Sequence, residues 1–144
     1  MAHRVLIFGL PGAGKTYLAE RLSTRISCAW FNADDVRKKY DDWDFTDEGR
    51  LRQATRMRDL AANAEETLAL VDFVCPTNAL RDVFDADTSI WLNTISAGRY
   101  EDTNKLFEQP NDANRIIDHF YSDSEIDDLA TWLAERAGTG SQNV

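Results

Sequence analysis

One eight-residue segment, Gly9-Leu10-Pro11-Gly12-Ala13-Gly14-Lys15-Thr16, constrains this chain more than any other part of it. The segment matches the GxxxxGK[ST] phosphate-binding loop, and it stands between an expected strand at 4–8 and an expected helix at 14–26. Its glycines let successive backbone N–H groups converge on an anion, and the N-terminus of the following helix adds donors and partial positive charge. A glycine-rich turn without a ligand is the alternative, but it does not account for the strand–loop–helix context.

The segment therefore predicts binding of a nucleoside triphosphate. Lys15 is expected to reach the β- and γ-phosphates, and the Thr16 hydroxyl is expected to ligate Mg²⁺. The cofactors implied are ATP and Mg²⁺. The residues expected to contact the nucleotide are Gly9, Pro11, Gly12, Ala13, Gly14, Lys15, Thr16 and Tyr17.

Length and composition fit one domain that binds a small molecule. The chain has 144 residues, of which 43% are apolar, so we expect one domain over 1–137 and a disordered tail over 138–144. No apolar run approaches the roughly 20 residues that a membrane helix needs, and nothing resembles a signal peptide. Cys28 and Cys75 show neither a disulfide framework nor the spacing of metal ligands. We therefore expect a cytoplasmic protein without a membrane partner.

The charge is unevenly distributed. A net charge of −9 argues against a large nucleic-acid footprint, although it does not exclude nucleic acid altogether. Within this acidic chain, residues 37–58 concentrate seven basic side chains: Arg37, Lys38, Lys39, Arg50, Arg52, Arg56 and Arg58. This region is expected to bind a small anionic ligand, and a solvated helix face is the alternative.

Expected strands and helices alternate along the chain. The strands are expected at Val5–Phe8, Ala29–Asn32, Leu68–Phe73, Ser89–Leu92 and Arg115–Asp118. The helices are expected at Gly14–Ile26, Asp34–Tyr40, Asp47–Glu66, Asn78–Phe84 and Asp123–Ala137. Apolar strands separated by helices predict an α/β fold of three layers, a five-stranded parallel sheet with helices on both faces. Ligands then collect at the carboxyl ends of the strands.

Two further segments carry finer expectations. In the third helix, Leu51, Ala54, Met57 or Arg58, Ala61 and Ala64 form an apolar stripe at helical spacing. Residues 98–110 are polar, and they are expected to be an irregular cover over the nucleotide.

Acidic residues follow two of the expected strands. Asp34 and Asp35 either cap the helix that they begin or place a carboxylate near the phosphate loop. In the second case Asp34 would position or deprotonate an acceptor hydroxyl, and we assign it a catalytic role beside Lys15. Asp72 follows Leu68-Ala69-Leu70-Val71, where it would either coordinate Mg²⁺, directly or through water, or hydrogen-bond to a neighbouring loop.

Several segments resemble the adenylylsulfate kinases, and most closely the short kinase-like forms found in phage and marine bacterial genomes. Phe31-Asn32-Ala33-Asp34-Asp35-Val36-Arg37 resembles the DGDNVR segment of this family, and 44–50 resembles its GFSxxDR segment. Phe73-Val74-Cys75-Pro76 is similar to its FISP turn, and Phe107-Glu108-Gln109-Pro110 to its YEAP turn. The resemblance covers about residues 5–118, in order, and it implies the P-loop kinase fold.

The resemblance implies transfer of the ATP γ-phosphate to the 3′-hydroxyl of adenylylsulfate, with Arg99 or Lys105 closing over the phosphates. Asp34, Arg37 and Arg50 match residues near the accepting hydroxyl and the phosphosulfate, and arginine forks suit such oxyanions. Phe45 and Tyr100 match aromatics on either side of the substrate adenine, although Phe45 in a hydrophobic staple is the alternative. The other positions expected to bind substrate are Gln53, Cys75 and Pro76. Family members often form dimers, so a homodimer is a further expectation.

Departures from the family pattern concern the acceptor. Asn32 and Gly49 stand where the family has aspartates, Gln53 and Cys75 replace an asparagine and a serine, and the basic lid retains only Arg99 and Lys105. These changes leave room for two other functions. One is a kinase for another nucleotide or for a hydroxymethylpyrimidine, free or within DNA, in a phage modification pathway. The other is a nucleotide-binding module without turnover.

Overall fold

Strands and helices alternate along the chain, as the sequence predicts. The computed structural model describes residues 2–98 and 101–138. Its strands are β1 (His3–Phe8), β2 (Ala29–Asn32), β3 (Leu68–Asp72), β4 (Thr88–Leu92) and β5 (Arg115–Ile117). Its helices are α1 (Lys15–Ser23), α2 (Ala33–Tyr40), α3 (Asp47–Ala62), α4 (Asn78–Phe84), α5 (Glu101–Leu106) and α6 (Asp123–Arg136).

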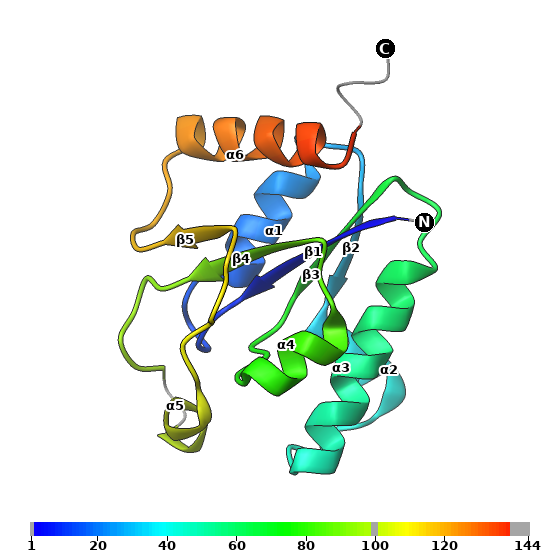
Figure 1. Ribbon diagram of the computed structural model, residues 1–144, viewed down its shortest axis with the longest axis vertical. Coiled ribbons are helices and arrows are strands. Elements are labelled where there is room, and N and C mark those ends of the chain that lie inside the picture. Colours follow the sequence, from blue (N-terminus) through cyan, green and yellow to red (C-terminus); the bar gives the residue numbers. More distant parts are fainter. Residues whose placement is uncertain (1, 99–100, 139–144) are drawn as a thin grey trace.

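The five strands form one sheet in the order β2-β3-β1-β4-β5, and every neighbouring pair is parallel (Figure 1). The central strand is β1, so the segment that follows it leaves the middle of the carboxyl edge. The register pairs Asp72 with Ile7 on one side and with Asn32 on the other. Three strands thus end at one level of the sheet, where parallel α/β folds bind ligands.

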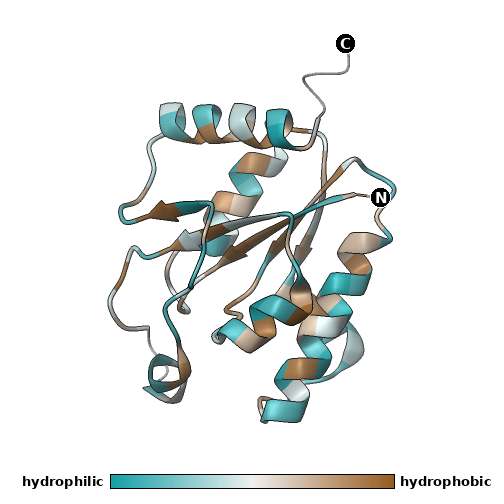
Figure 2. Cartoon of the chain, viewed as in Figure 1, coloured by the Kyte–Doolittle hydropathy of each residue, from teal (hydrophilic) through white to brown (hydrophobic). Residues whose placement is uncertain are grey.

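Helices cover both faces of the sheet. In Figure 1, α1 and α6 lie on one face and α3 and α4 on the other, while α2 packs beside α3 and β2. Alternate residues of β1 enter separate cores: Val5 and Ile7 pack under α1 and α6, and Leu6 and Phe8 pack under α3 and α4. The second half of β1 and most of β3 are accordingly brown in Figure 2. The predicted five-stranded, three-layer α/β architecture is confirmed.

The prediction that residues 98–110 are irregular is wrong in part, because helix α5 occupies Glu101–Leu106. A six-residue helix is too short to show apolar periodicity, and this one is held by polar contacts. Asn104 exchanges two hydrogen bonds with the Gly98 backbone, at 2.7 and 3.0 Å, and Lys105 pairs with Glu101 at 3.9 Å.

Other differences are small. Helices α1 and α3 end earlier than predicted, at Ser23 and Ala62. In the predicted stripe of α3, Ala54, Met57 and Ala61 are buried, but Leu51 is 47% exposed. The predicted contacts of Arg99 and Tyr100, and the tail beyond Gly138, lie outside the described residues. In the described ranges, no helix is both long and apolar enough to cross a membrane.

Candidate functional site

The phosphate loop joins the carboxyl end of β1 to α1. Gly9 passes so close to β4 that a Cβ would stand 2.6 Å from the Leu92 carbonyl oxygen. Gly14 has φ 98°, a left-handed conformation that strains any L side chain. It also occupies the N-cap of α1 without a side-chain cap, so the first N–H groups of the helix remain for an anion.

Neighbouring segments hold the loop in this shape. Lys15 Nζ donates to the Leu10 carbonyl oxygen at 3.0 Å, so the ammonium lies over its own loop. After β4, the Thr94 hydroxyl donates to the Ala13 carbonyl oxygen at 2.7 Å. Gly98 approaches the loop closely enough that a Cβ would stand 2.8 Å from the Pro11 carbonyl oxygen. The start of the predicted cover therefore lies beside the loop.

A buried carboxylate connects the loop to β2. Asp72 is 2% exposed, and its carboxylate accepts hydrogen bonds from Trp30 Nε1 at 2.6 Å, Asn32 Nδ2 at 2.9 Å and Thr16 Oγ1 at 3.4 Å. Asn32 Nδ2 also donates to Thr16 Oγ1, at 3.1 Å. Burial raises the pKa of Asp72, although the Trp30 indole, the Lys15 charge and the other two donors oppose that shift. The structure thus brings Thr16 and Asp72 together, and their ligation of Mg²⁺ stays a prediction.

Sequence reasoning missed Asn32 and Trp30. The Asn32 side chain uses both ends of its amide, because Oδ1 caps α2 by accepting from the Asp35 N–H at 3.0 Å. An aspartate at this position could accept that bond but could not donate to Thr16 and Asp72. These hydrogen bonds explain why asparagine suits this position. Comparison with the family pattern shows only that an aspartate is missing there.

Asp34 and Asp35 lie exposed in the first turn of α2. Because Asn32 caps the helix, the alternative that Asp34 or Asp35 does so is wrong. The charge of Asp34 acts on Arg37, one turn along the helix. Among the described residues, no group of three or more His, Cys, Asp and Glu side chains could hold a metal. The predicted Mg²⁺ ligands stay Thr16 and, directly or through water, Asp72.

Arg37 and Arg50 both contact the backbone of residues 41–46, the loop that connects α2 to α3. Arg37 is 5% exposed, and its Nη1 donates to the carbonyl oxygens of Asp42 at 2.9 Å and Asp44 at 3.1 Å. Arg50 Nε donates to the Phe45 carbonyl oxygen at 3.0 Å. Burial lowers the pKa of both arginines. Their predicted binding of an acceptor anion stays a prediction, and the contacts observed here stabilise the loop.

Phe45 is 52% exposed and lies between the same two arginines. The guanidinium carbons stand 4.2 Å (Arg37) and 5.4 Å (Arg50) from its ring centroid. Because Thr46 caps α3, Phe45 and Arg50 hold the two positions of a hydrophobic staple, with a cation in place of the second apolar group.

The carboxylates of the same loop bind two more arginines. Asp42 accepts from Arg52 at 2.8 and 3.1 Å and from Arg56 at 3.2 and 3.3 Å, and these hydrogen bonds lower the pKa of Asp42. Asp44 accepts from Arg52 at 3.1 Å and from the Thr46 hydroxyl at 2.7 Å. Gly49, where the family has an aspartate, packs directly on Asp44, whose carbonyl oxygen occupies the place of a Cβ.

The remaining predicted substrate residues are buried. Gln53 Nε2 donates to the Ala33 carbonyl oxygen at 3.1 Å, which ties α3 to the start of α2. The Cys75 thiol has its pKa raised by burial, and its backbone adopts φ 44°. The Pro76 carbonyl oxygen accepts from the Glu108 N–H at 2.7 Å, so the two turns that resemble the family, about 30 residues apart, lie in contact.

The structure adds a residue beside the loop that the sequence did not single out. Phe120, just after β5, is 64% exposed, and its ring lies 3.2 Å from the place of a Cβ on Gly14. It shares a small hollow of about 20 Å³ with Tyr17, Thr94 and His119. No local signal identifies Phe120, because its neighbours come from distant segments of the chain.

No family model and no curated protein sequence matches this chain. Solved structures do match its fold. An adenylylsulfate (APS) kinase from Mycobacterium tuberculosis in complex with AMPPNP and APS has a TM-score of 0.72 at 16% identity, covering 95% of this chain and 98% of that one. A gluconokinase from Sinorhizobium meliloti gives 0.65 at 16% identity, covering 99% and 100%. A shikimate kinase from Acinetobacter baumannii in complex with shikimate gives 0.61 at 18% identity, covering 99% and 97%.

These similarities show that the chain has the P-loop kinase fold, as predicted. The three proteins act on chemically different acceptors according to their names, so the shared fold does not select one of them. The identity of the acceptor therefore depends on the residues of this chain.

Proposed function

We propose that this chain is an ATP- and Mg²⁺-dependent kinase that transfers the γ-phosphate to a hydroxyl of a nucleotide-like acceptor, within one kinase domain over residues 1–137. The observation that carries the proposal is the junction at the carboxyl edge of the sheet, where the phosphate loop, the Thr16–Asp72 contact and the Asn32 cap of α2 meet. Asp34 lies two residues beyond that cap, within reach of an acceptor placed over α2.

Each residue at the junction has a proposed role. The loop N–H groups and Lys15 bind the phosphates, Thr16 ligates Mg²⁺, and Asp72 with Asn32 holds Thr16. When bound, the metal neutralises charge on the β- and γ-phosphate oxygens. Asp34 accepts the proton of the acceptor hydroxyl or orients it. Phe120 and Tyr17 offer apolar contacts to the nucleobase of ATP.

Adenylylsulfate is the first acceptor to test. The order of the family-like segments supports it, as does the contact between the turns at Pro76 and Glu108. Phe45 would contact the acceptor base, with Arg37 and Arg50 beside it.

A second acceptor class is favoured by a specific observation. Arg37 and Arg50 donate to carbonyl oxygens of the loop at 41–46, which reduces what they can offer to a phosphosulfate. An acceptor that needs the aromatic ring but not an anion clamp fits this arrangement better. A hydroxymethylpyrimidine nucleotide, free or within DNA, comes nearer to this, because its accepting hydroxyl is on the base and its phosphate is remote from that hydroxyl.

The test is ADP formation from ATP and Mg²⁺ with a panel of acceptors: adenylylsulfate, hydroxymethyl-dUMP, a hydroxymethylated oligonucleotide, gluconate and shikimate. Stimulation by one of the first three supports the proposal and selects the acceptor class, whereas stimulation by gluconate or shikimate alone contradicts it. Tight ATP binding by calorimetry without turnover on any acceptor would identify a nucleotide-binding module instead.

A further inference from the structure

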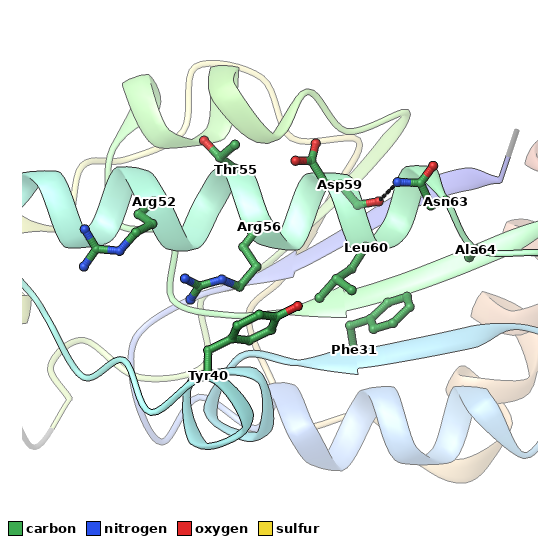
Figure 3. A pocket seen from close by; sticks show the side chains of 9 residues that line it. All are labelled: Phe31, Tyr40, Arg52, Thr55, Arg56, Asp59, Leu60, Asn63 and Ala64. Atoms are coloured by element: carbon green, nitrogen blue, oxygen red, sulfur yellow. Dashed lines mark hydrogen bonds between the residues drawn. The ribbon is translucent and has the colours of Figure 1, made fainter.

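The edge strand β2 presents its side chains alternately to the two faces of the sheet. Phe31 packs in the core under α3 and α4, and Figure 3 shows it with Leu60 beside a hollow of about 640 Å³. Trp30 packs instead against the core under α1 and α6. Asn32 follows two residues later, so it shares the face of Trp30. Trp30 and Asn32 therefore lie on the side of the sheet that α1 covers, and the hollow lies on the other side.

Asp72 projects from the neighbouring strand β3 onto the same face as Trp30. Leu68 and Leu70 of β3 belong to the core under α1, so the alternation places Asp72 there as well. The register pairs Asn32 with Asp72 and Trp30 with Leu70. Trp30 is thus diagonal to Asp72, and their backbones are about 8 Å apart from strand spacing and rise. The long indole spans this gap, because its Nε1 donates to Asp72 Oδ2 at 2.6 Å.

The two oxygens of the Asp72 carboxylate have different partners. Oδ2 is bound by Trp30, whereas Oδ1 accepts from Asn32 Nδ2 at 2.9 Å and from the Thr16 hydroxyl at 3.4 Å. The indole N–H can only donate a hydrogen bond. A carboxylate bound at Oδ2 in this way cannot rotate without losing that bond. Trp30 therefore keeps Oδ1 directed at Thr16 of the phosphate loop.

These contacts in turn orient the Thr16 hydroxyl, which has one proton and two lone pairs. Thr16 donates its proton to Asp72 Oδ1, and it accepts from Asn32 Nδ2 at 3.1 Å with one lone pair. Within residues 2–98 and 101–138 the hydroxyl has no other hydrogen-bond partner, so its second lone pair remains for a metal. Oxygen is the ligand atom that Mg²⁺ prefers, and the arrangement therefore fits this ion.

We propose that Trp30 is a positioning residue for Mg²⁺·ATP, which acts through Asp72 to keep the Thr16 oxygen in the orientation that ligates the metal. This rests on the proposed function and adds to it a side chain outside the phosphate loop. Removing a residue that orients a metal ligand typically costs about 10–100-fold in metal affinity or activity. In this role Trp30 contacts neither the metal nor ATP, so ATP binding without Mg²⁺ does not depend on it.

Calorimetric ATP binding, measured in excess Mg²⁺ and separately in EDTA, tests the inference without phosphoryl transfer. Trp30→Phe keeps an aromatic ring in the core and removes the N–H. Trp132→Phe is the matched control. Trp132 is also half-buried against the core under α1 and α6, but it belongs to α6, where it contacts Arg115 and Arg136. Binding in EDTA shows that each variant is folded.

Trp30→Phe should weaken ATP binding about tenfold in Mg²⁺ and leave binding in EDTA within about twofold of wild type. Trp132→Phe should match wild type under both conditions. In an Asp72→Asn background the carboxylate through which Trp30 acts is already lost. There Trp30→Phe should weaken binding in Mg²⁺ by no more than about twofold, because the two changes remove the same interaction.

Three results would overturn the inference: equal loss of binding in Mg²⁺ and in EDTA, a Trp30→Phe variant indistinguishable from Trp132→Phe in Mg²⁺, or an undiminished effect in the Asp72→Asn background. ADP formation with the acceptor panel is measured in parallel on the same proteins. Any of the three results with wild-type turnover present rejects the role of Trp30 and leaves the kinase proposal standing. A magnesium-dependent loss in Trp30→Phe, with no turnover of wild type on any acceptor, rejects the kinase proposal alone.

Discussion

Two loops at the carboxyl edge of the sheet are built in opposite ways. The phosphate loop at 9–16 is shaped by glycine backbone and by contacts among its own residues, and it leaves helix N–H groups exposed to a ligand. The loop at 41–46 is shaped by four arginine side chains from the helices on either side of it. The first loop presents backbone donors, and the second presents aromatic rings. A single change should therefore affect the two loops very differently.

The largest effect is expected at the phosphate loop. Lys15→Ala removes the only side-chain cation of that loop, and ADP formation should fall about a hundredfold or more, because charge on the transferred phosphoryl group is no longer offset. Arg25→Ala, which removes a cation just beyond the far end of α1, is the control and should retain activity. Equal activity of Lys15→Ala and Arg25→Ala would show that the loop does not act on a triphosphate.

The second prediction concerns Asn32, a side chain outside the GxxxxGK[ST] segment that contacts the phosphate loop through Thr16. Asn32→Asp keeps an acceptor for the cap of α2 but removes two donated hydrogen bonds and places a second carboxylate beside Asp72. The free energy of unfolding should fall by about 1–3 kcal/mol. Urea denaturation measures it, and the magnesium dependence of ATP binding should change as well.

Asn63→Asp is the matched control for that change. Asn63 is exposed at the end of α3, where its Nδ2 donates to the Asp59 carbonyl oxygen. If Asn32→Asp were no more destabilising than Asn63→Asp, the Asn32 amide would not be what connects β2 to the phosphate loop.

The difference between the loops also explains what could be predicted from sequence. The phosphate loop acts through local backbone conformation, so eight consecutive residues predict both its shape and its ligand. The parallel sheet follows equally well from buried runs such as Leu68–Asp72. Arg37 and Arg50 are expected at an acceptor anion because they match arginines of the family and because arginine suits oxyanions, and the structure shows both bound to carbonyl oxygens. An arginine's partner depends on tertiary packing, and spacing along the chain does not contain that information.

Trp30 and Asn32 illustrate the same limit. Their contact with Asp72 spans about 40 residues and depends on the register between β2 and β3. Helix α5 was missed for a related reason, since its polar contacts with Gly98 have no periodic pattern.

The third prediction separates the two roles of the arginines. Asp42→Asn leaves Arg37 and Arg50 in place but weakens the carboxylate that holds Arg52 and Arg56. If the arginines chiefly hold the loop, Asp42→Asn and Arg50→Ala should both raise the acceptor KM severalfold while the ATP KM stays unchanged. Asp41→Asn is the control, because Asp41 is exposed and its left-handed conformation suits asparagine. An effect confined to Arg50→Ala would instead favour direct contact with an acceptor anion.

The smallest effect is expected at the two histidines of the chain, His119 near the phosphate loop and His3 at the opposite end of β1, whose titrations have opposite signs. His119 bonds Asp118 at 2.9 Å and Glu125 at 2.8 Å, and these carboxylates raise its pKa above the usual 6.5. Its stabilisation is present below about pH 6.5 and is lost as pH rises through the raised value. Burial lowers the pKa of His3, so its contribution is present above about pH 6.5 and is lost as pH falls.

Thermal unfolding at pH 6 and pH 8.5 distinguishes the two histidines. Relative to wild type, His119→Gln should lower the midpoint temperature more at pH 6 than at pH 8.5, and His3→Gln should lower it more at pH 8.5 than at pH 6. The change at His119 should be modest, because its side chain is more than half exposed and surface ion pairs contribute little. If His119→Gln also alters ATP affinity between the two pH values, then the segment carrying Phe120 contributes to nucleotide binding. Binding at the phosphate loop would then depend on side chains, as the shape of the loop at 41–46 does. An unchanged ATP affinity would mean that the phosphate loop acts through its backbone and the loop at 41–46 through side chains.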